Sequence, residues 1–287
     1  MAGTALHTIM LPVGGDAMGA HVFAHAAALA RRFGSRLRVV HCHPRPQDLM
    51  PYGVVMPRMV RSQLEAAANA AADSTAHHIA EEFETLAATH GVSVGDHAPD
   101  TATARFIEYE GKAVDAVIHY GRVSDLICVP QPHGRDFAVS ILKAALFSSG
   151  RPVMLCPETD SVPDTLGAHV SIAWNGSLEA TRAVALAMPL IEAAGRVTIL
   201  ASRHEDHTAT PEQLQRYLEL KEVTAEIRLF TARGSVVGRQ LLEETGAAGC
   251  DLMVMGAYHE SYERESMFGG NSQVVVDEAR LPVVLVH

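Results

Sequence analysis

The segment DLICV, residues 125–129, returns near the C-terminus as DLMVM, residues 251–255. Each copy is followed by a second matching pair, RPVML at 151–155 and LPVVL at 281–285. Continuously apolar runs of this length are typical of parallel strands covered on both faces. The repeats therefore indicate two copies of one unit built around a parallel sheet.

Strand-like and helix-like segments alternate upstream of both repeats. The expected elements are strand 7–13, helix 18–33 and a strand from Arg36 in the first half, and strand 170–174, helix 178–194 and a strand from Arg196 in the second half. This alternation is typical of βαβ units with right-handed crossovers. We therefore predict an α/β fold with two tandem doubly wound parallel five-stranded sheets, which are Rossmann-like.

The first half is longer because it carries an insertion. The repeats are further apart at Arg36 and Arg196 than at Asp125 and Asp251, so the extra residues lie between these points, at about 44–90. This stretch holds a Pro-rich loop followed by a long Ala-rich helix.

A polar, Pro-containing linker separates the two halves. We assign residues 1–157 to the first domain and 168–287 to the second. Ligands of such sheets bind beyond the carboxyl ends of the strands, where the strand order reverses.

The composition argues against two classes of partner. A net charge of −10 and a pI of about 5.9 do not suit a nucleic-acid binder, whose phosphate contacts need clustered Lys and Arg. We find no apolar run long enough for a membrane span and no secretory signal at the N-terminus, so we expect a cytoplasmic protein.

Cysteines and histidines do not form a recognisable metal-binding pattern. The four cysteines, Cys42, Cys128, Cys156 and Cys250, lie far apart inside apolar runs and are expected to be buried as small hydrophobic residues. The histidine pairs spaced to share a ligand are His21 with His25, His41 with His43, and His204 with His207. None of these pairs has further ligands at a known spacing, so we assign no metal site.

The loop after the second repeat, GAYHESYERESMFGGNS at 256–272, can be interpreted in two ways. Gly269 and Gly270 precede a helix expected from Ser272, whose free N–H groups and dipole would favour a phosphate. Gly256 permits a close backbone approach, and Ser272 could donate to a phosphate or cap the helix. The alternative is a plain strand-to-helix connector.

The tandem units and this loop resemble the universal stress protein family. Its nucleotide-binding members carry the pattern G-x2-G-x9-G-[ST], in which Gly256 takes the first place, His259 the second and Gly269 the third. Gly270 stands where Ser or Thr is usual. A bacterial variant of the pattern also matches at Ser261, Arg264, Glu265 and Ser272. His259 for glycine and Glu260 for histidine depart from that variant.

The resemblance implies an adenine nucleotide, ATP or AMP/ADP, with or without Mg²⁺, in the second domain. The family binds it through the first strand-to-helix turn, the end of the second strand and the glycine loop. The corresponding residues here are Ala173, Trp174, Asn175, Ala201, Gly256, His259, Gly269, Gly270, Asn271 and Ser272. Asn175 is also an ordinary N-cap candidate, and Trp174 could line the pocket or only pack against the linker.

The first domain lacks the features of a phosphate loop. After Val129 it continues with Pro130 and Pro132, which have no N–H donors, and its loop has one glycine and no Gly-Gly pair. We therefore predict that the first domain is degenerate and that the second binds the nucleotide.

Three functions follow from this comparison. The first is a stress-response regulatory protein that binds ATP or a related nucleotide in its C-terminal domain and an unknown protein partner. The second is a nucleotide-free interaction scaffold. The third is a weak ATP hydrolase or phosphotransferase, although no general base is placed for water and we assign no catalytic residue. Terminal strands in the family pair across dimers, so 152–156 and 282–286 are expected to form an internal pseudo-dimer, and a homodimer of whole chains stays open.

Overall fold

The computed structural model describes residues 6–14, 19–43, 45, 57–96, 98, 100–132, 136–203, 208–232, 237–258 and 270–287. The elements of the first unit are β1 (Thr8–Gly14), α1 (Ala20–Phe33), β2 (Arg36–His43), α2 (Arg58–Thr89), β3 (Ser93–Val94), β4 (Thr103–Glu110), α3 (Ala113–Gly121), β5 (Leu126–Pro130), α4 (Asp136–Ser148) and β6 (Val153–Cys156). Those of the second unit are β7 (His169–Ala173), α5 (Leu178–Leu186), α6 (Met188–Glu192), β8 (Arg196–Ser202), α7 (Pro211–Glu219), β9 (Ala225–Phe230), α8 (Val237–Ala247), β10 (Leu252–Gly256), α9 (Gly270–Glu278) and β11 (Val283–Val286).

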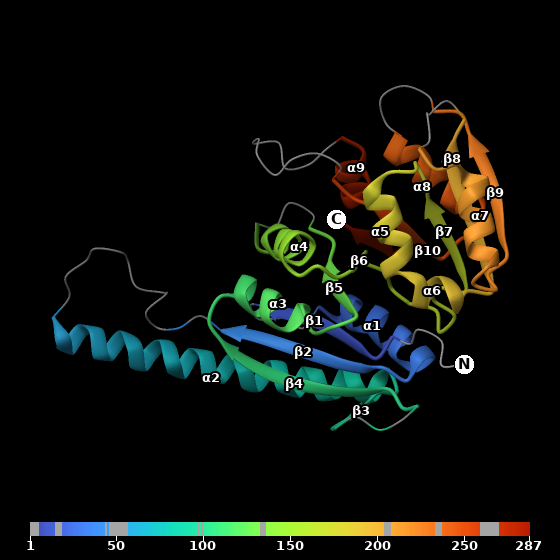
Figure 1. Cartoon of the computed structure of the whole chain (residues 1–287). Helices are drawn as coiled ribbons and strands as arrows, with labels where there is room; N and C mark the ends of the chain where they lie inside the picture. Colours follow the sequence, from blue (N-terminus) through green and yellow to red (C-terminus); the bar gives the residue numbers. More distant parts are fainter. Residues whose placement is uncertain are drawn as a thin grey trace.

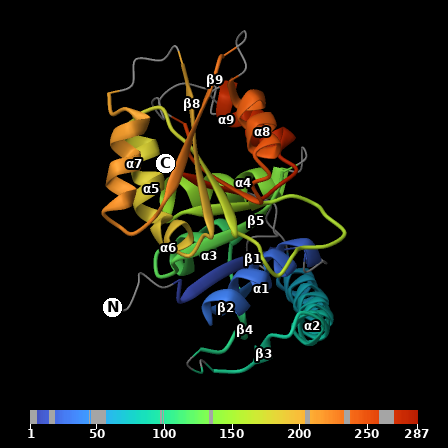
Figure 2. The same ribbon diagram turned by 90° about the vertical axis from the view of Figure 1, so that its right-hand side faces the viewer.

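The strands form one continuous sheet in the order β3-β4-β2-β1-β5-β6-β11-β10-β7-β8-β9 (Figures 1 and 2). Pairing is parallel throughout each unit, with the order reversing beside β1 in the first and beside β7 in the second. Two doubly wound sheets are therefore present, as the repeats predict, and the two-residue β3 extends the first one.

An antiparallel pairing joins the two units. Val283 lies opposite Leu155, Val284 opposite Met154 and Leu285 opposite Val153. Both strands are completely buried. The expected pairing of the terminal strands, which makes an internal pseudo-dimer, is confirmed.

Helices cover both faces of the sheet, as expected for strands that are apolar on both sides. Ile9 and Leu11 of β1 point into one core, whereas Met10 points into the other. The first core is closed by α1, α2, α5, α6 and α7, and the second by α3, α4, α8 and α9. Both cores run through the seam between the units, because alternate residues of β6 and β11 belong to each.

One helix expected from the sequence is broken in two. The predicted helix over 178–194 ends at Leu186 and resumes at Met188. Pro189 explains the break, since its ring would clash with the carbonyl of the preceding turn in a continuous helix.

The insertion is largely a longer crossover helix. Helix α2 has 32 residues, whereas its counterpart α7 has 9, and residues 46–56 of the Pro-rich loop lie outside the described residues. Ala76, Ile79 and Phe83 form a buried stripe at helical spacing, and the first turns of α2 extend beyond the sheet in Figure 1. Among the described residues, no helix combines the length and the apolar character needed to cross a membrane.

A carboxylate at the start of the repeated segment has the same role in both units. Asp125 accepts the backbone N–H groups of His7 and Thr8 at 3.0 and 2.9 Å. Asp251 accepts those of the three residues 167–169 at 3.1 to 3.2 Å. The repeated aspartate therefore fixes the chain where the first strand of each unit begins.

The four cysteines are buried and unpaired with one another. Burial raises the pKa of the Cys42 thiol to about 12. Burial also raises the pKa of Cys156, with a smaller contribution from a hydrogen bond to Cys128. Since the thiolate is the reactive form, these side chains act as small hydrophobic residues.

We expect Asp251→Ala to lower the free energy of unfolding by about 1–3 kcal/mol, because three backbone donors lose a charged acceptor. Asp125→Ala removes the acceptor of only two backbone donors, so it should lower the free energy of unfolding by less. Urea denaturation of both variants measures the difference. Equal stability of Asp251→Ala and the parent chain would contradict the role given to this carboxylate.

We also expect the native chain to react slowly with a thiol reagent at pH 8, because all four cysteines are buried away from the reagent. All four cysteines should react once the chain is unfolded. The absorbance of the thiolate released from the reagent, followed over time, gives the reaction rate of the native chain and the number of thiols that react after unfolding. A fast native phase from Cys42 would contradict its buried position.

Candidate functional site

A cleft with a volume of about 160 Å³ lies at the carboxyl ends of the second unit's strands. It sits beside β7, where the strand order reverses, which is the usual ligand position in such sheets. Its walls are Ala173, Trp174, Asn175, Ser177, Glu179, Leu200, Ser202, Phe230, Val237, Leu241, Met255, Gly256, Ala257, Tyr258, Asn271 and Ser272.

Six of the ten residues predicted from the sequence line this cleft. They are Ala173, Trp174, Asn175, Gly256, Asn271 and Ser272. His259 and Gly269 lie outside the described residues, as do Ser261, Arg264 and Glu265 of the loop. Gly270 is the exposed first residue of α9, one position before Asn271. Ala201 is buried within β8, and the cleft is lined by its neighbours Leu200 and Ser202.

The turn after β7 forms one wall. Trp174 is buried, and its indole N–H donates to the carbonyl of Ala209 at 2.8 Å, so it lines the cleft while anchoring the segment before α7. The side-chain oxygen of Asn175 accepts the N–H of Ser177 at 3.1 Å. Ser177, and not Asn175, is the N-cap of α5, since its hydroxyl accepts the N–H of Ala180 at 3.2 Å.

The start of α9 forms the opposite wall. The Ser272 hydroxyl is buried and accepts the N–H of Tyr258 at 3.2 Å, which leaves its own proton for another acceptor. The Asn271 side-chain oxygen accepts the N–H of Gly238 at 3.2 Å and so joins α9 to the start of α8. A Cβ atom added to Gly270 would meet no other atom within 4 Å, so its backbone faces open space.

Gly256 has a structural role that the sequence reading did not identify. A Cβ atom there would lie 2.5 Å from the backbone nitrogen of Ala180 and 2.5 Å from the carbonyl carbon of Glu179. The glycine therefore lets the end of β10 pack directly on the first turn of α5. This close approach accounts for the residue without a bound phosphate.

Several cleft residues were missed by the sequence reading. Ser202 and Phe230 are the last residues of β8 and β9, so the carboxyl-end rule could have indicated them once the strand ends were known. Val237 and Leu241 come from α8, whose position depends on tertiary contacts.

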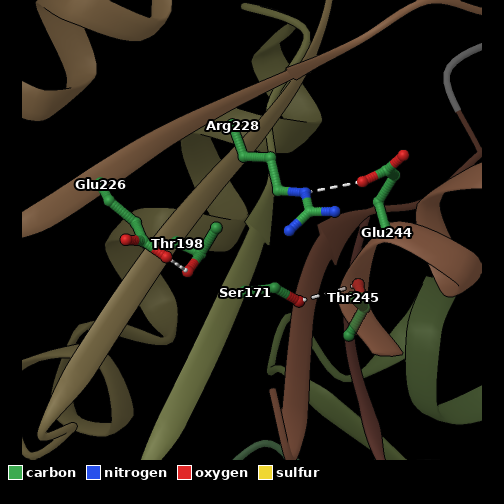
Figure 3. A network of polar contacts seen from close by, with 6 residues as sticks. All are labelled: Ser171, Thr198, Glu226, Arg228, Glu244 and Thr245. Carbon is green, nitrogen blue, oxygen red and sulfur yellow. Dashed lines mark hydrogen bonds and ion pairs between the residues drawn. The ribbon is translucent and has the colours of Figure 1, made fainter. Parts of the chain in front are cut away.

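Two side-chain contacts hold α8 against the sheet, and a third joins β8 to β9 (Figure 3). The hydroxyls of Ser171 on β7 and Thr245 on α8 are 3.1 Å apart. Arg228 on β9 donates to Glu244 on α8 at 2.7 Å, and Thr198 donates to Glu226 at 2.9 Å. Since buried polar groups need partners, the buried Ser171–Thr245 contact favours one placement of α8 and thereby of its cleft residues, and the partly exposed Arg228–Glu244 pair adds a second link to the sheet.

The equivalent strand ends of the first unit carry different side chains. Strand register makes Val40 the counterpart of Leu200 and Cys42 that of Ser202, because Thr8 pairs with Arg36 as His169 pairs with Arg196. Gln131 matches Ala257, since each donates its N–H to the terminal strand of its own unit. The two units have therefore diverged at the positions that make the cleft.

Within the described ranges, no group of three or more His, Cys, Asp or Glu side chains is arranged to hold a metal ion. His21 and His25 share a face of α1, where the ring of His25 contacts the backbone carbonyl of His21 at 2.7 Å. His41 and His43 lie at the end of β2. His204 and His207 are outside the described residues.

Comparison with known proteins agrees with the fold and the repeats. Residues 5–129 match the model of the Universal stress protein family. Among curated proteins, no sequence matches this chain.

Solved structures share the fold over nearly the whole chain. A universal stress protein from Archaeoglobus fulgidus DSM 4304 has a TM-score of 0.69 at 15% identity, covering 97% of this chain and 95% of that one. A candidate universal stress protein from Pseudomonas aeruginosa UCBPP-PA14 has a TM-score of 0.52 at 12% identity, covering 98% and 93%. A functionally unknown protein from Pseudomonas aeruginosa PAO1 also has a TM-score of 0.52, at 13% identity, covering 98% and 92%. The first unit therefore matches the universal stress protein family in sequence, and the whole length of the chain shares the fold of a solved universal stress protein.

Proposed function

We propose that the chain is a regulatory protein that binds an adenine nucleotide, ATP or AMP/ADP, in the cleft of its second unit. The observation that carries this proposal is the meeting of an apolar wall with the open first turn of α9 at the carboxyl ends of the strands. Nucleotide occupancy would change the surface offered to a protein partner in a stress response.

The cleft has separate places for the two ends of a nucleotide. We place the base against the apolar side chains Leu200, Phe230 and Leu241. The phosphates would lie at the start of α9, where unpaired N–H groups and the helix dipole favour an anion and Gly270 leaves room. Mg²⁺, if required, would be held chiefly by the phosphates, because the described residues offer no cluster of ligands.

The size of the cleft indicates how much of the ligand would enter it. Ligand pockets usually have about 300–1,000 Å³, whereas this cleft has a volume of about 160 Å³. We therefore expect only part of the nucleotide, the base first, to lie in the cleft and the phosphates to lie outside it at the start of α9.

A nucleotide-free scaffold is the second candidate. Gly256, the first residue of the loop pattern, is explained by its packing against α5. A glycine with a structural cause gives no support to nucleotide binding, so the scaffold has to be tested directly.

Isothermal titration of the full chain with ATP, ADP and AMP, with and without Mg²⁺, tests the proposal. We expect one site per chain. Gly270→Val should weaken binding at least about tenfold, because its side chain would occupy the path of the phosphates at the helix start. No heat with any of the three nucleotides would favour the scaffold.

A matched control separates this effect from general damage. Gly246 on α8 also faces open space, has no cleft contact and lies in a helix, so Gly246→Val introduces the same change elsewhere. It should leave the affinity unchanged. Equal losses from both variants would contradict the position assigned to the phosphates.

Gly256→Ala should behave differently from Gly270→Val. The added methyl group would overlap the backbone of α5, so the free energy of unfolding should fall by about 1–3 kcal/mol. Urea denaturation without ligand measures this loss. A fully stable Gly256→Ala would show that β10 does not pack on α5 as described.

A further inference from the structure

Two side chains of the first unit cross the seam to the walls of the second unit's cleft. Phe147 of α4 packs against the ring of Tyr258, with ring centroids 5.5 Å apart. The side-chain amide of Gln131, which follows β5, donates to the backbone carbonyl of Val276 in α9 at 2.8 Å. Tyr258 lines the cleft, and so do Asn271 and Ser272 at the start of α9, the helix to which Val276 belongs.

Tyr258 has a backbone conformation that needs support. Its φ is +62°, in the left-handed region that a bulky L-residue adopts only at a cost. Such conformations persist where the surroundings hold them in place. The N–H of Tyr258 is held by Ser272, and its ring, which is 8% exposed, is held by Phe147.

The end of the chain strengthens the same contact. The ring of His287 meets Phe147 edge-on with centroids 4.8 Å apart. The same histidine also reaches the backbone of the cleft, because a ring nitrogen of His287 lies 3.2 Å from the carbonyl oxygen of Ala257. Phe147 therefore supports both residues that lead from β10 into the loop, one directly and one through His287.

Gln131 acts on the opposite wall. It is 5% exposed, so its amide is buried in the seam and its hydrogen bond is made away from water. Helix α9 has nine residues, and Val276 lies about one helical turn after Ser272. Fixing it at Val276 therefore also fixes Asn271 and Ser272 at its start.

We propose that the first unit completes the ligand site of the second, with Phe147 and Gln131 as positioning residues for Tyr258 and α9. This inference rests on the proposed nucleotide site for its affinity test. The first unit, whose own loop lacks the phosphate-binding glycines, then has a function, which is to support the cleft of the second unit.

The experiment compares Phe147→Ala, Phe147→Leu and Phe137→Ala in the full chain. Phe137 lies on the same helix but is 47% exposed, which makes it a matched control for the loss of a phenyl ring from α4. The readouts are the affinity for ATP by titration and the backbone hydrogen exchange of residues 257–258 and 270–276. Urea denaturation reports overall stability.

We expect Phe147→Ala to weaken ATP binding roughly three- to thirtyfold and to speed exchange in these two segments, because Tyr258 loses its packing. Phe147→Leu should recover most of both effects, and Phe137→Ala should produce neither. Gln131→Leu, which fills the same space without donating, should speed exchange in α9 even where Phe147→Ala folds poorly.

The outcomes separate this inference from the proposed function. If the parent chain binds no nucleotide, the proposed function fails, and exchange alone decides whether Phe147 positions the cleft. Unchanged affinity and unchanged local exchange in Phe147→Ala overturn the inference. Faster exchange spread evenly over the whole chain also overturns it, because that pattern reports lost stability only.

Discussion

The antiparallel pairing of β6 with β11 is the constraint on which the rest of the molecule depends. Each strand is apolar on both faces and would otherwise be the edge of its unit, with unpaired backbone groups and no polar side chains to protect them. Pairing the two edges satisfies those groups and joins both cores across the seam. A single sheet of eleven strands results.

The direction of this pairing also explains which parts of the two units meet. Because β6 and β11 run in opposite directions, the carboxyl ends of the second unit's strands lie beside the amino ends of the first unit's strands. Helix α4 ends beside the amino ends of the first unit's strands. Phe147, near the end of α4, therefore contacts Tyr258, which follows β10. The same geometry applies with the two units exchanged, so Gln131, which follows β5 in the first unit, contacts helix α9 of the second unit. Both contacts are present although only the second unit's loop carries paired glycines.

The sequence was sufficient for the parts of the structure that repeat. Apolar runs such as 281–285 predicted buried parallel strands, and the two aspartates marked equivalent positions that make equivalent backbone contacts. Local chemistry could also have predicted the break at Pro189. The strand ends predicted a cleft beyond β7 and β10, and most of the predicted residues that the structure describes do line it.

Contacts between distant segments were beyond the reach of local patterns. Val237 and Leu241 enter the cleft because Thr245 and Glu244 fix α8 on polar partners in β7 and β9. Nothing in the segment around Gln131 shows that its amide will reach a carbonyl in α9, 145 residues away. Tyr258 gave no signal either, since its conformation is held by Phe147 and Ser272 from other elements.

The two described glycines of the loop show why a motif match needs geometry before it becomes a site. Gly256 is required by the approach of β10 to α5, so any protein with this packing would keep it whether or not it binds a ligand. For Gly270 no such cause is found among the described residues, because a Cβ atom there would meet no atom within 4 Å. Gly270, and not Gly256, is therefore the glycine whose substitution tests the proposed phosphate position without disturbing the packing of β10.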